Sequence, residues 1–267
     1  MTRVMLCASV LTAAGVLVRD PLVRGQAHDA ASVLAAAHEA LGGDRNLAAV
    51  KTFLATGRAR QLRGNNLVPI EFEIACELPD KYVRRDEFPA QDIPPAVNGF
   101  RGDEAIGPSK TTREEFARLM LGAFAGAPPA FPLTFAYAAE AEAPEGKADV
   151  LAVAGPANFS ARFLVQRETH IPVMLMWQAP GPAGRGGPDA PPAGPGRGVP
   201  PAGPGRGAPP ATVEHRLYYA DYRAVTGGVK WPFRIRHAVA SATIEETTFD
   251  RVTINAKIDP KKFEALK

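Results

Sequence analysis

Apolar and polar residues alternate along most of the chain after residue 50. Ile70, Phe72, Ile74 and Cys76 fall on one side of an extended segment, and glutamates occupy most of the other side. A period of two is typical of a strand with one buried face. The same alternation recurs at 131–137, 159–165 and 233–236, and turn-forming residues separate the runs at 64–66, 79–80, 144–146 and 227–228. Short strands at this spacing predict a mainly β fold with an antiparallel meander rather than β–α–β units.

The first segment with helical periodicity lies near the N-terminus. Asp29 is a residue type that caps helices, and apolar residues follow it at helical spacing as far as Leu41. The glycine pair that begins at Gly42 is a typical helix stop. We therefore expect a helix from Asp29 to Leu41, a second short turn over 44–50, and then a strand.

A further helix interrupts the alternating pattern at 112–125. Thr112 and Glu115 have the spacing of a capping box, and an apolar stripe follows at helical spacing. The stripe consists of Phe116, Leu119, Met120, Ala123 and Phe124. Because the strands on either side have one apolar face, we expect this helix to lie in the concavity of a curved sheet.

Residues 180–210 differ in composition from the rest of the chain. They contain 11 Pro and 10 Gly in 31 positions, and the nine residues from Pro191 recur from Pro200 with one change. Such a segment cannot bury enough apolar surface to form a core. We expect a disordered Pro/Gly-rich insertion between neighbouring strands at 171–177 and 213–222. A tolerated loop expansion is favoured over a contact element for a partner.

The first 27 residues have the pattern of an export signal. An uncharged apolar stretch over 4–18 follows Arg3, and the small residues Gly25 and Ala27 suit cleavage before His28. The stretch is too short to cross a membrane comfortably. We expect a signal peptide at 1–27 and a periplasmic mature protein, with a buried helix or an uncleaved anchor as the alternatives.

Most of the net positive charge lies in this N-terminal segment. The whole chain carries +3, and the segment 1–27 holds +2 of it. The remaining chain is close to neutral, so its charge does not indicate a nucleic-acid partner. Cys76 is then the one cysteine left, and its apolar strand neighbours favour a buried, inert thiol.

The chain has no recognisable catalytic or metal-binding motif. Its five His lack metal-ligand spacing, and no Ser lies in a G-x-S-x-G turn. His215 and His237 lie on predicted strands and could meet across a sheet, but we interpret them as satisfied or surface residues. Glu245 and Glu246 are strand neighbours that point to opposite faces, so they cannot share a proton. We expect no enzymatic activity, no cofactor and no metal.

Short motifs are spread along the chain outside the insertion. They are EALGG at 39–43, LAAVK at 47–51, LPDKY at 78–82, PLTF at 132–135, DYRAV at 221–225, GVKWP at 228–232, IN at 254–255 and IDPKKF at 258–263. In this order they resemble the outer-membrane lipoprotein-sorting (LolA-like) carrier family, of which the chain looks like a divergent member. The resemblance implies one domain over 28–179 and 211–267. Its fold would be a strongly curved, unclosed antiparallel barrel with helices lidding the concave face.

The same resemblance implies a periplasmic protein that shields acyl chains or another hydrophobic ligand, and it carries over no catalytic residue. An open sheet with a helix in its concavity leaves an apolar interior that a chain-like ligand can share. Eight residues are predicted to line this interior: Phe72, Ile74, Phe116, Leu119, Met120, Phe124, Phe135 and Met176. The alternative for each is a place in a fully packed core.

We therefore expect a carrier or binding protein for a hydrophobic ligand in the bacterial cell envelope. Its expected partners are lipid or lipoprotein acyl chains and transient envelope proteins, without nucleic acid or a stable membrane span, and we expect a monomer. The alternative is a non-enzymatic interaction module of the envelope that uses the Pro/Gly-rich insertion as its contact element.

Overall fold

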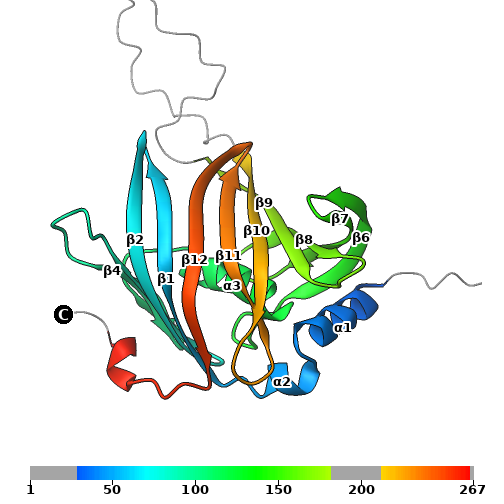
Figure 1. The fold of residues 1–267 in the computed structure, drawn as a ribbon, viewed down its shortest axis with the longest axis horizontal. Helices are drawn as coiled ribbons and strands as arrows, with labels where there is room; N and C mark the ends of the chain where they lie inside the picture. The colour runs from blue at the N-terminus through cyan, green and yellow to red at the C-terminus, as the bar shows by residue number, and fades with distance from the viewer. Residues whose placement is uncertain (1–28, 182–211, 265–267) are drawn as a thin grey trace, which may run out of the picture.

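The computed structural model describes residues 29–181 and 212–264, and within them the strands form one antiparallel sheet of twelve (Figure 1). The predicted signal peptide and residues 182–210 of the predicted insertion lie outside the described residues. The order of the strands is β5-β4-β3-β2-β1-β12-β11-β10-β9-β8-β7-β6. Their bounds are β1 Thr52–Arg63, β2 Asn66–Glu77, β3 Lys81–Glu87, β4 Ala96–Arg101, β5 Glu104–Ile106, β6 Thr134–Ala143, β7 Gly146–Ala154, β8 Ser160–Gln166, β9 Pro172–Pro180, β10 Thr212–Ala224, β11 Lys230–Val239 and β12 Ala242–Ile254.

The order of the strands is that of a meander with one exception. β1 pairs with β12, with Phe53 opposite Ile254, so the first and last strands lie side by side in the middle of the sheet. β5 and β6 follow one another in the sequence but form the two opposite edges. The sheet is therefore curved and unclosed, which confirms the predicted fold class and the predicted pairing of the strands on either side of the insertion.

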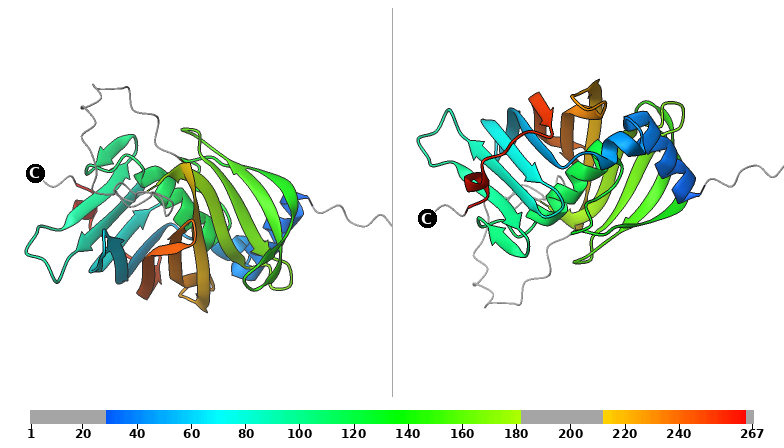
Figure 2. Two further views of the ribbon diagram at one scale, coloured as in Figure 1. Left: turned by 90° about the horizontal axis from the view of Figure 1, so that it is seen from above. Right: turned by 90° about the horizontal axis from the view of Figure 1, so that it is seen from below.

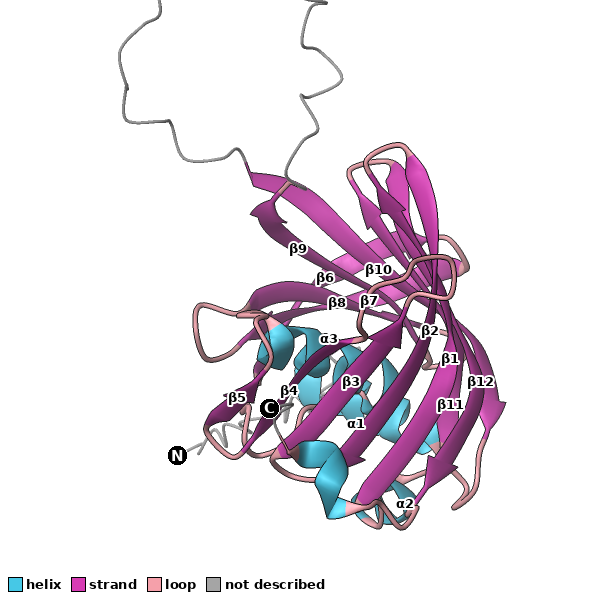
Figure 3. Ribbon diagram, turned by 90° about the vertical axis from the view of Figure 1, so that its left-hand side faces the viewer, coloured by secondary structure: helices cyan, strands magenta, loops and turns pink. Residues whose placement is uncertain are grey.

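The helix α3 (Thr112–Phe124) connects these two edges by crossing the concavity. Figures 2 and 3 show it within the curve of the sheet, with β1–β4 on one side and β6–β10 on the other. Phe116 and Met120 pack with residues of β1–β4, β11 and β12. Ala117 and Leu121, on another side of the helix, pack with residues of β7–β10. Both halves of the sheet therefore pack against one helix.

The start of α3 differs from the predicted capping box. The N-cap is Thr111, and no side chain caps a backbone amide there. Thr111 Oγ1 instead donates to Glu115 Oε1 at 2.6 Å. Thr112 is the first helical residue and is 5% exposed. The prediction of Thr112 as the cap is wrong, because Thr112 already belongs to the helix and the N-cap is the residue that precedes it.

The N-terminal helices close the lower end of the concavity in the view of Figure 1. In α1 (Ala30–Leu41), Asp29 Oδ1 accepts from the Ser32 amide at 2.6 Å, which confirms the predicted cap. Gly42 ends the helix with φ of 132°. A Cβ there would lie 2.3 Å from the carbonyl oxygen of Gly228, so the helix end packs directly on the turn between β10 and β11.

The remaining elements are short. The helix α2 (Asp44–Ala48) follows α1, and the 3₁₀ helix η1 (Pro260–Phe263) follows the last strand. β6 begins only at Thr134, so the alternating run predicted at 131–137 is a strand in its second half alone. Phe131 lies before the strand because its ring packs edge-on against Phe159 in the core, with 5.5 Å between ring centroids.

Two apolar clusters fill the concavity on either side of α3. Trp231 is fully buried in the first, where its ring lies 5.1 Å from that of Phe53. Cys76 belongs to the same cluster, and burial raises the pKa of its thiol. The predicted burial of Cys76 is thus confirmed, and the raised pKa disfavours the reactive thiolate.

Candidate ligand-binding site

A pocket of about 450 Å³ lies between the concave face of the sheet and α3. Its lining includes Ala179, near the end of β9, and Ile244, near the start of β12, so it lies at the end of the sheet opposite α1 and α2 (Figure 1). Other hollows on the outer face are lined mainly by charged side chains. Apolar residues from five elements line part of the pocket: Ile74, Leu119, Leu217, Ile235 and Phe249.

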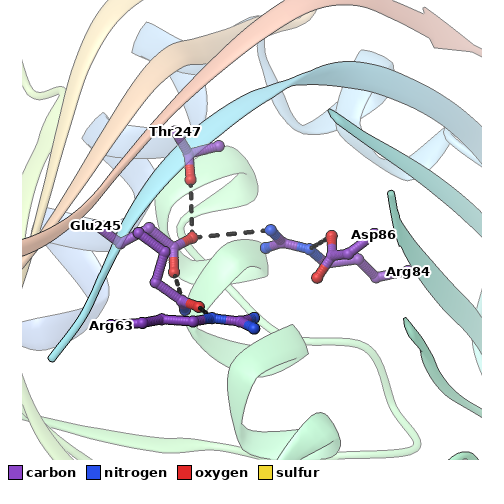
Figure 4. A network of polar contacts seen from close by, with 6 residues as sticks. Arg63, Arg84, Asp86, Glu245 and Thr247 are labelled. Carbon is purple, nitrogen blue, oxygen red and sulfur yellow. Dashed lines mark hydrogen bonds and ion pairs between the residues drawn. The ribbon is translucent and has the colours of Figure 1, made fainter. Parts of the chain in front are cut away.

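The first group of polar side chains in the pocket is centred on Arg84, from β3 (Figure 4). Its Nε donates to Asp86 Oδ1 at 2.7 Å, and its Nη2 lies 3.7 Å from Glu245 Oε1. Its guanidinium also lies over the ring of Phe72, 5.0 Å from the centroid. Burial opposes the charge, but Asp86 and Glu245 raise the pKa of Arg84 above its ordinary value. This buried cation is paired within the protein.

Glu245 links this ion pair to the neighbouring strand β1. It accepts hydrogen bonds from Gln61 Nε2 at 2.9 Å and from Thr247 Oγ1 at 3.1 Å. Arg63 Nε in turn donates to Gln61 Oε1 at 2.8 Å (Figure 4). The carboxylate therefore has three polar partners from three strands. Glu245 lines the pocket and Glu246 does not, which agrees with the prediction that the two point to opposite faces.

The second group of polar side chains consists of Trp177, His215 and His237, from β9, β10 and β11. The indole lies 5.2 Å from the ring of His215 and 5.4 Å from that of His237. The two imidazoles are in direct contact, with His215 Nδ1 3.0 Å from His237 Nε2. The two histidines do meet across the sheet, and with the indole they form an aromatic wall whose rings are tilted by 28–38° to one another.

The hydrogen bonds of the histidine pair assign its tautomers. His215 Nε2 lies 3.3 Å from the carbonyl oxygen of Pro180, which can only accept, so this nitrogen carries the proton. His215 Nδ1 is then the acceptor from His237 Nε2. Burial lowers the pKa of His215, and burial together with His215 lowers the pKa of His237 to about 4. Both rings are neutral at pH 7.

Arg118 projects into the pocket from α3 and completes this wall. Its guanidinium lies 4.3 Å from the ring centroid of Trp177 and 5.5 Å from that of Phe159. Its Nε is buried and has no hydrogen-bond partner. No carboxylate of the described chain comes within ion-pair distance of this guanidinium, and burial lowers its pKa. Arg118 is thus a largely buried cation in contact with aromatic rings, and Glu114 and Glu115 act on it only from beyond ion-pair distance.

The eight predicted ligand-binding residues occupy several environments. Ile74 and Leu119 line the pocket. Phe135 is partly buried against the second apolar cluster. Met176 alternates with Trp177 and packs on the other face of the sheet, against a small cluster of β7–β9. The others belong to the packed cluster beside the pocket: Phe72, Phe116, Met120 and Phe124. A role in ligand binding stays a prediction for all eight.

Several polar pocket residues were missed in the sequence. Arg84, Arg118 and Trp177 were not singled out, and the two histidines were given no role. Arg84 carried a usable signal, because it comes two residues after Tyr82, on the face of β3 that points into the concavity. Arg118 carried none, since a charged residue in an amphipathic helix is usually on its solvated face.

Comparison with known proteins finds solved structures of the same fold. No protein-family model and no curated protein matches the sequence. A LolA superfamily protein from Nitrosomonas europaea matches with a TM-score of 0.54 and 13% identity, over 89% of this chain and 98% of that one. An outer membrane lipoprotein-sorting protein domain from Vibrio parahaemolyticus matches with a TM-score of 0.51 and 10% identity, over 86% of this chain and 95% of that one.

The described part of the chain contains no helix long and apolar enough to cross a membrane. Its curved sheet is open between β5 and β6, and its concave face is covered by α3. Together with the matched structures, this arrangement shows that the chain has the LolA-like fold.

Proposed function

We propose that this protein is a carrier or binding protein for a hydrophobic ligand, such as lipoprotein acyl chains or another lipid, in the bacterial cell envelope. The observation that carries the proposal is the pocket between α3 and the concave face of the sheet. Its volume of about 450 Å³ falls within the range of roughly 300–1,000 Å³ that is usual for small-molecule sites.

The chemistry of the lining supports binding rather than catalysis. Ile74, Leu119 and Phe249 offer apolar surface, and the described lining has neither Ser nor Cys beside the histidine pair. A nucleophile with its base in hydrogen-bond reach is the usual sign of covalent catalysis. Two structures of the same fold come from the LolA superfamily and from a lipoprotein-sorting protein, which agrees with a carrier.

The proposal includes the place where the protein works. We infer that residues 1–27 direct export, that 28–179 and 211–267 form a single carrier domain, and that the mature protein acts in the periplasm. Export would bring the pocket to the compartment where lipids and lipoproteins cross between membranes. Envelope proteins that load and unload the ligand would then be transient partners.

Native mass spectrometry of the full-length protein, purified from the periplasm without detergent, tests the proposal. We expect a bound lipid of defined mass, which solvent extraction releases. Leu119→Trp should lower the lipid-bound fraction several-fold, because the larger ring enters the pocket from α3. A wild-type protein that is ligand-free and takes up no lipid when mixed with it would overturn the proposal.

A matched substitution separates pocket filling from a general effect of added indole. Leu67 is 59% exposed, near the hairpin that joins β1 and β2, and it does not line the pocket. Leu67→Trp should leave the lipid-bound fraction unchanged. Thermal melting of both variants shows whether each remains folded.

A further inference from the structure

We propose that Arg118 and the aromatic wall beside it form the site for a carboxylate headgroup, so that the ligand is a single-chain lipid carrying one negative charge. This inference rests on the proposed function, since it names the chemistry of the ligand for the same pocket. Two arginines, Arg84 and Arg118, line this pocket.

Arg84 and Arg118 differ in how their charges are compensated. Arg84 has Asp86 as a hydrogen-bonded partner at 2.7 Å and Glu245 at 3.7 Å. Arg118 has no carboxylate within 4 Å among the described residues, and its Nε lacks any hydrogen-bond partner. Burying a cation without an anion is costly. A ligand that supplies the missing anion therefore gains more from Arg118 than from Arg84.

The orientation of Arg118 suits a planar anion. The ring of Trp177 lies over the guanidinium, 4.3 Å from its central carbon. A cation–π contact of this kind occupies none of the guanidinium N–H groups with an acceptor, so they stay free to donate in the plane of the guanidinium. A carboxylate can accept two parallel hydrogen bonds in that plane, which is the strongest arrangement for such a pair.

The charges around the site favour a single negative charge over two. Asp86, Glu115 and Glu245 also line the pocket. Asp86 and Glu245 are engaged with Arg84, and Glu115 Oε1 accepts from Thr111. Glu114 and Glu115 raise the pKa of Arg118 from a distance, against the effect of burial. A second negative charge would double the repulsion from these carboxylates, whereas Arg118 still offers only one pair of parallel hydrogen bonds to hold the headgroup.

The histidine pair and the apolar lining complete the site. His215 and His237 are neutral at pH 7 and bond to one another, so they add aromatic surface without a competing charge. Leu119 lies one residue after Arg118 on α3, and Ile74 and Ile235 line the same pocket. A headgroup at Arg118 thus leaves the tail of the ligand in contact with apolar side chains.

Displacement of the neutral fluorescent probe N-phenyl-1-naphthylamine from the delipidated full-length protein at pH 8 tests the inference. The competitors are dodecanoate, dodecanol and dodecyl phosphate, which share one tail and differ in charge. We expect dodecanoate to displace the probe at concentrations at least about 10-fold lower than either of the others. Arg118→Met should abolish this preference while dodecanol still competes, and Arg118→Lys should keep part of it.

Arg58→Met is the matched control, because this arginine lies on the outer face, where it bonds to Asp250. It should keep the preference for dodecanoate. Equal competition by dodecanoate and dodecanol, or stronger competition by dodecyl phosphate, would overturn the carboxylate site and leave the carrier function standing. A protein that binds neither the probe nor any competitor would instead contradict the carrier function itself.

Discussion

His237 is a pocket residue whose charge depends on its surroundings. It faces His215, Trp177, Arg118 and Glu245 within the described structure. Burial and His215 lower its pKa to about 4, against the attraction of Glu245. The unfolded chain, by contrast, takes up this proton near pH 6.5. The native state therefore binds fewer protons than the unfolded state between these two values.

This difference predicts that the protein loses stability as the pH falls from about 6.5 towards about 4. Above pH 6.5 the histidine is neutral in both states and costs no stability. By about pH 4 its protonation in the unfolded chain has lowered the free energy of unfolding by about 3 kcal/mol. Replacing His237 by Gln retains a donor for His215 but removes the titration. Urea unfolding at several pH values should show a flatter decline for His237→Gln than for the wild type.

His170 is an exposed histidine at which the same kind of change serves as the control. Its positive φ of 55° makes Asn a suitable replacement. His170→Asn should retain the wild-type dependence of stability on pH. If His237→Gln retains it as well, the buried histidine is not the cause.

For single residues, the sequence predicts whether a side chain is buried better than it predicts which other side chains it contacts. Cys76 and Leu119 are apolar in an alternating or helical pattern, and the structure buries both. Arg118 shares a helix with Leu119, but its position over Trp177 depends on how α3 crosses the sheet. Contacts between residues so far apart in the chain leave no local pattern.

Among the elements, α3 is held on the sheet by two tyrosines of β10. Tyr219 donates its hydroxyl to the carbonyl of Arg118, and Tyr222 donates to that of Gly122, both at 2.7 Å. Both acceptors lie within the helix, so these bonds fix its depth and rotation over the strands. The same contact sets the direction in which Arg118 enters the pocket.

The backbone of Gly122 lies so close to Tyr219 that adding a methyl group at this position should destabilise the protein. A Cβ there would lie 2.3 Å from the ring of Tyr219, which is fully buried and bonded to the helix, so the ring cannot move aside. Gly122→Ala should lower the free energy of unfolding by about 2 kcal/mol, despite the higher helix propensity of Ala. Thermal or urea unfolding measures the change.

Gly126 offers the matched control for this substitution. It follows the same helix, and the nearest atom to a Cβ there is 3.7 Å away. Gly126→Ala should change the stability by less than about 0.5 kcal/mol. A similar loss in both variants would show that the contact with Tyr219 is not the cause.

Local sequence predicts most of the strands and helices, but it predicts the residues at which they begin and end less accurately. The alternation of Ile70, Phe72 and Ile74 correctly predicts a strand with one buried face. The sequence predicts Thr112 as the cap of α3, but the structure has Thr111 there. Two adjacent threonines are equivalent as a sequence signal, and only packing against the rest of the fold distinguishes them.

At the scale of the whole molecule, β9 and β10 pair directly with each other on either side of the insertion. Pro180, at which the predicted insertion begins, is the last residue of β9, and its partner is Thr212. The register continues from there to Met174 and Tyr218. The two strands therefore pair up to the point where the composition changes.

This pairing predicts that residues 181–211 can be replaced by Asn-Gly, which suits a two-residue hairpin turn. The shorter connection should raise the free energy of unfolding by about 2 kcal/mol through a smaller loop-closure entropy. Displacement of N-phenyl-1-naphthylamine should be unchanged. Loss of probe binding in a stably folded variant would show that the insertion takes part in binding.

The overall topology follows from the sequence only with help from the resemblance. Period-two runs and turns predict a meander, but nothing local indicates that β1 lies beside β12. The likeness to the lipoprotein-sorting family supplied the curved and unclosed sheet that the structure has. The pairing of the two chain ends depends on residues nearly 200 positions apart, which no short pattern can specify.

The free edges at β5 and β6 give the sheet a property that a closed barrel lacks. In a closed barrel, the number of strands and their stagger set the diameter. Here the curvature can change by small twists at each of the strand pairs, without breaking a hydrogen bond between strands. We therefore expect the space beneath α3 to vary in width, so that one backbone can accommodate ligands of different thickness.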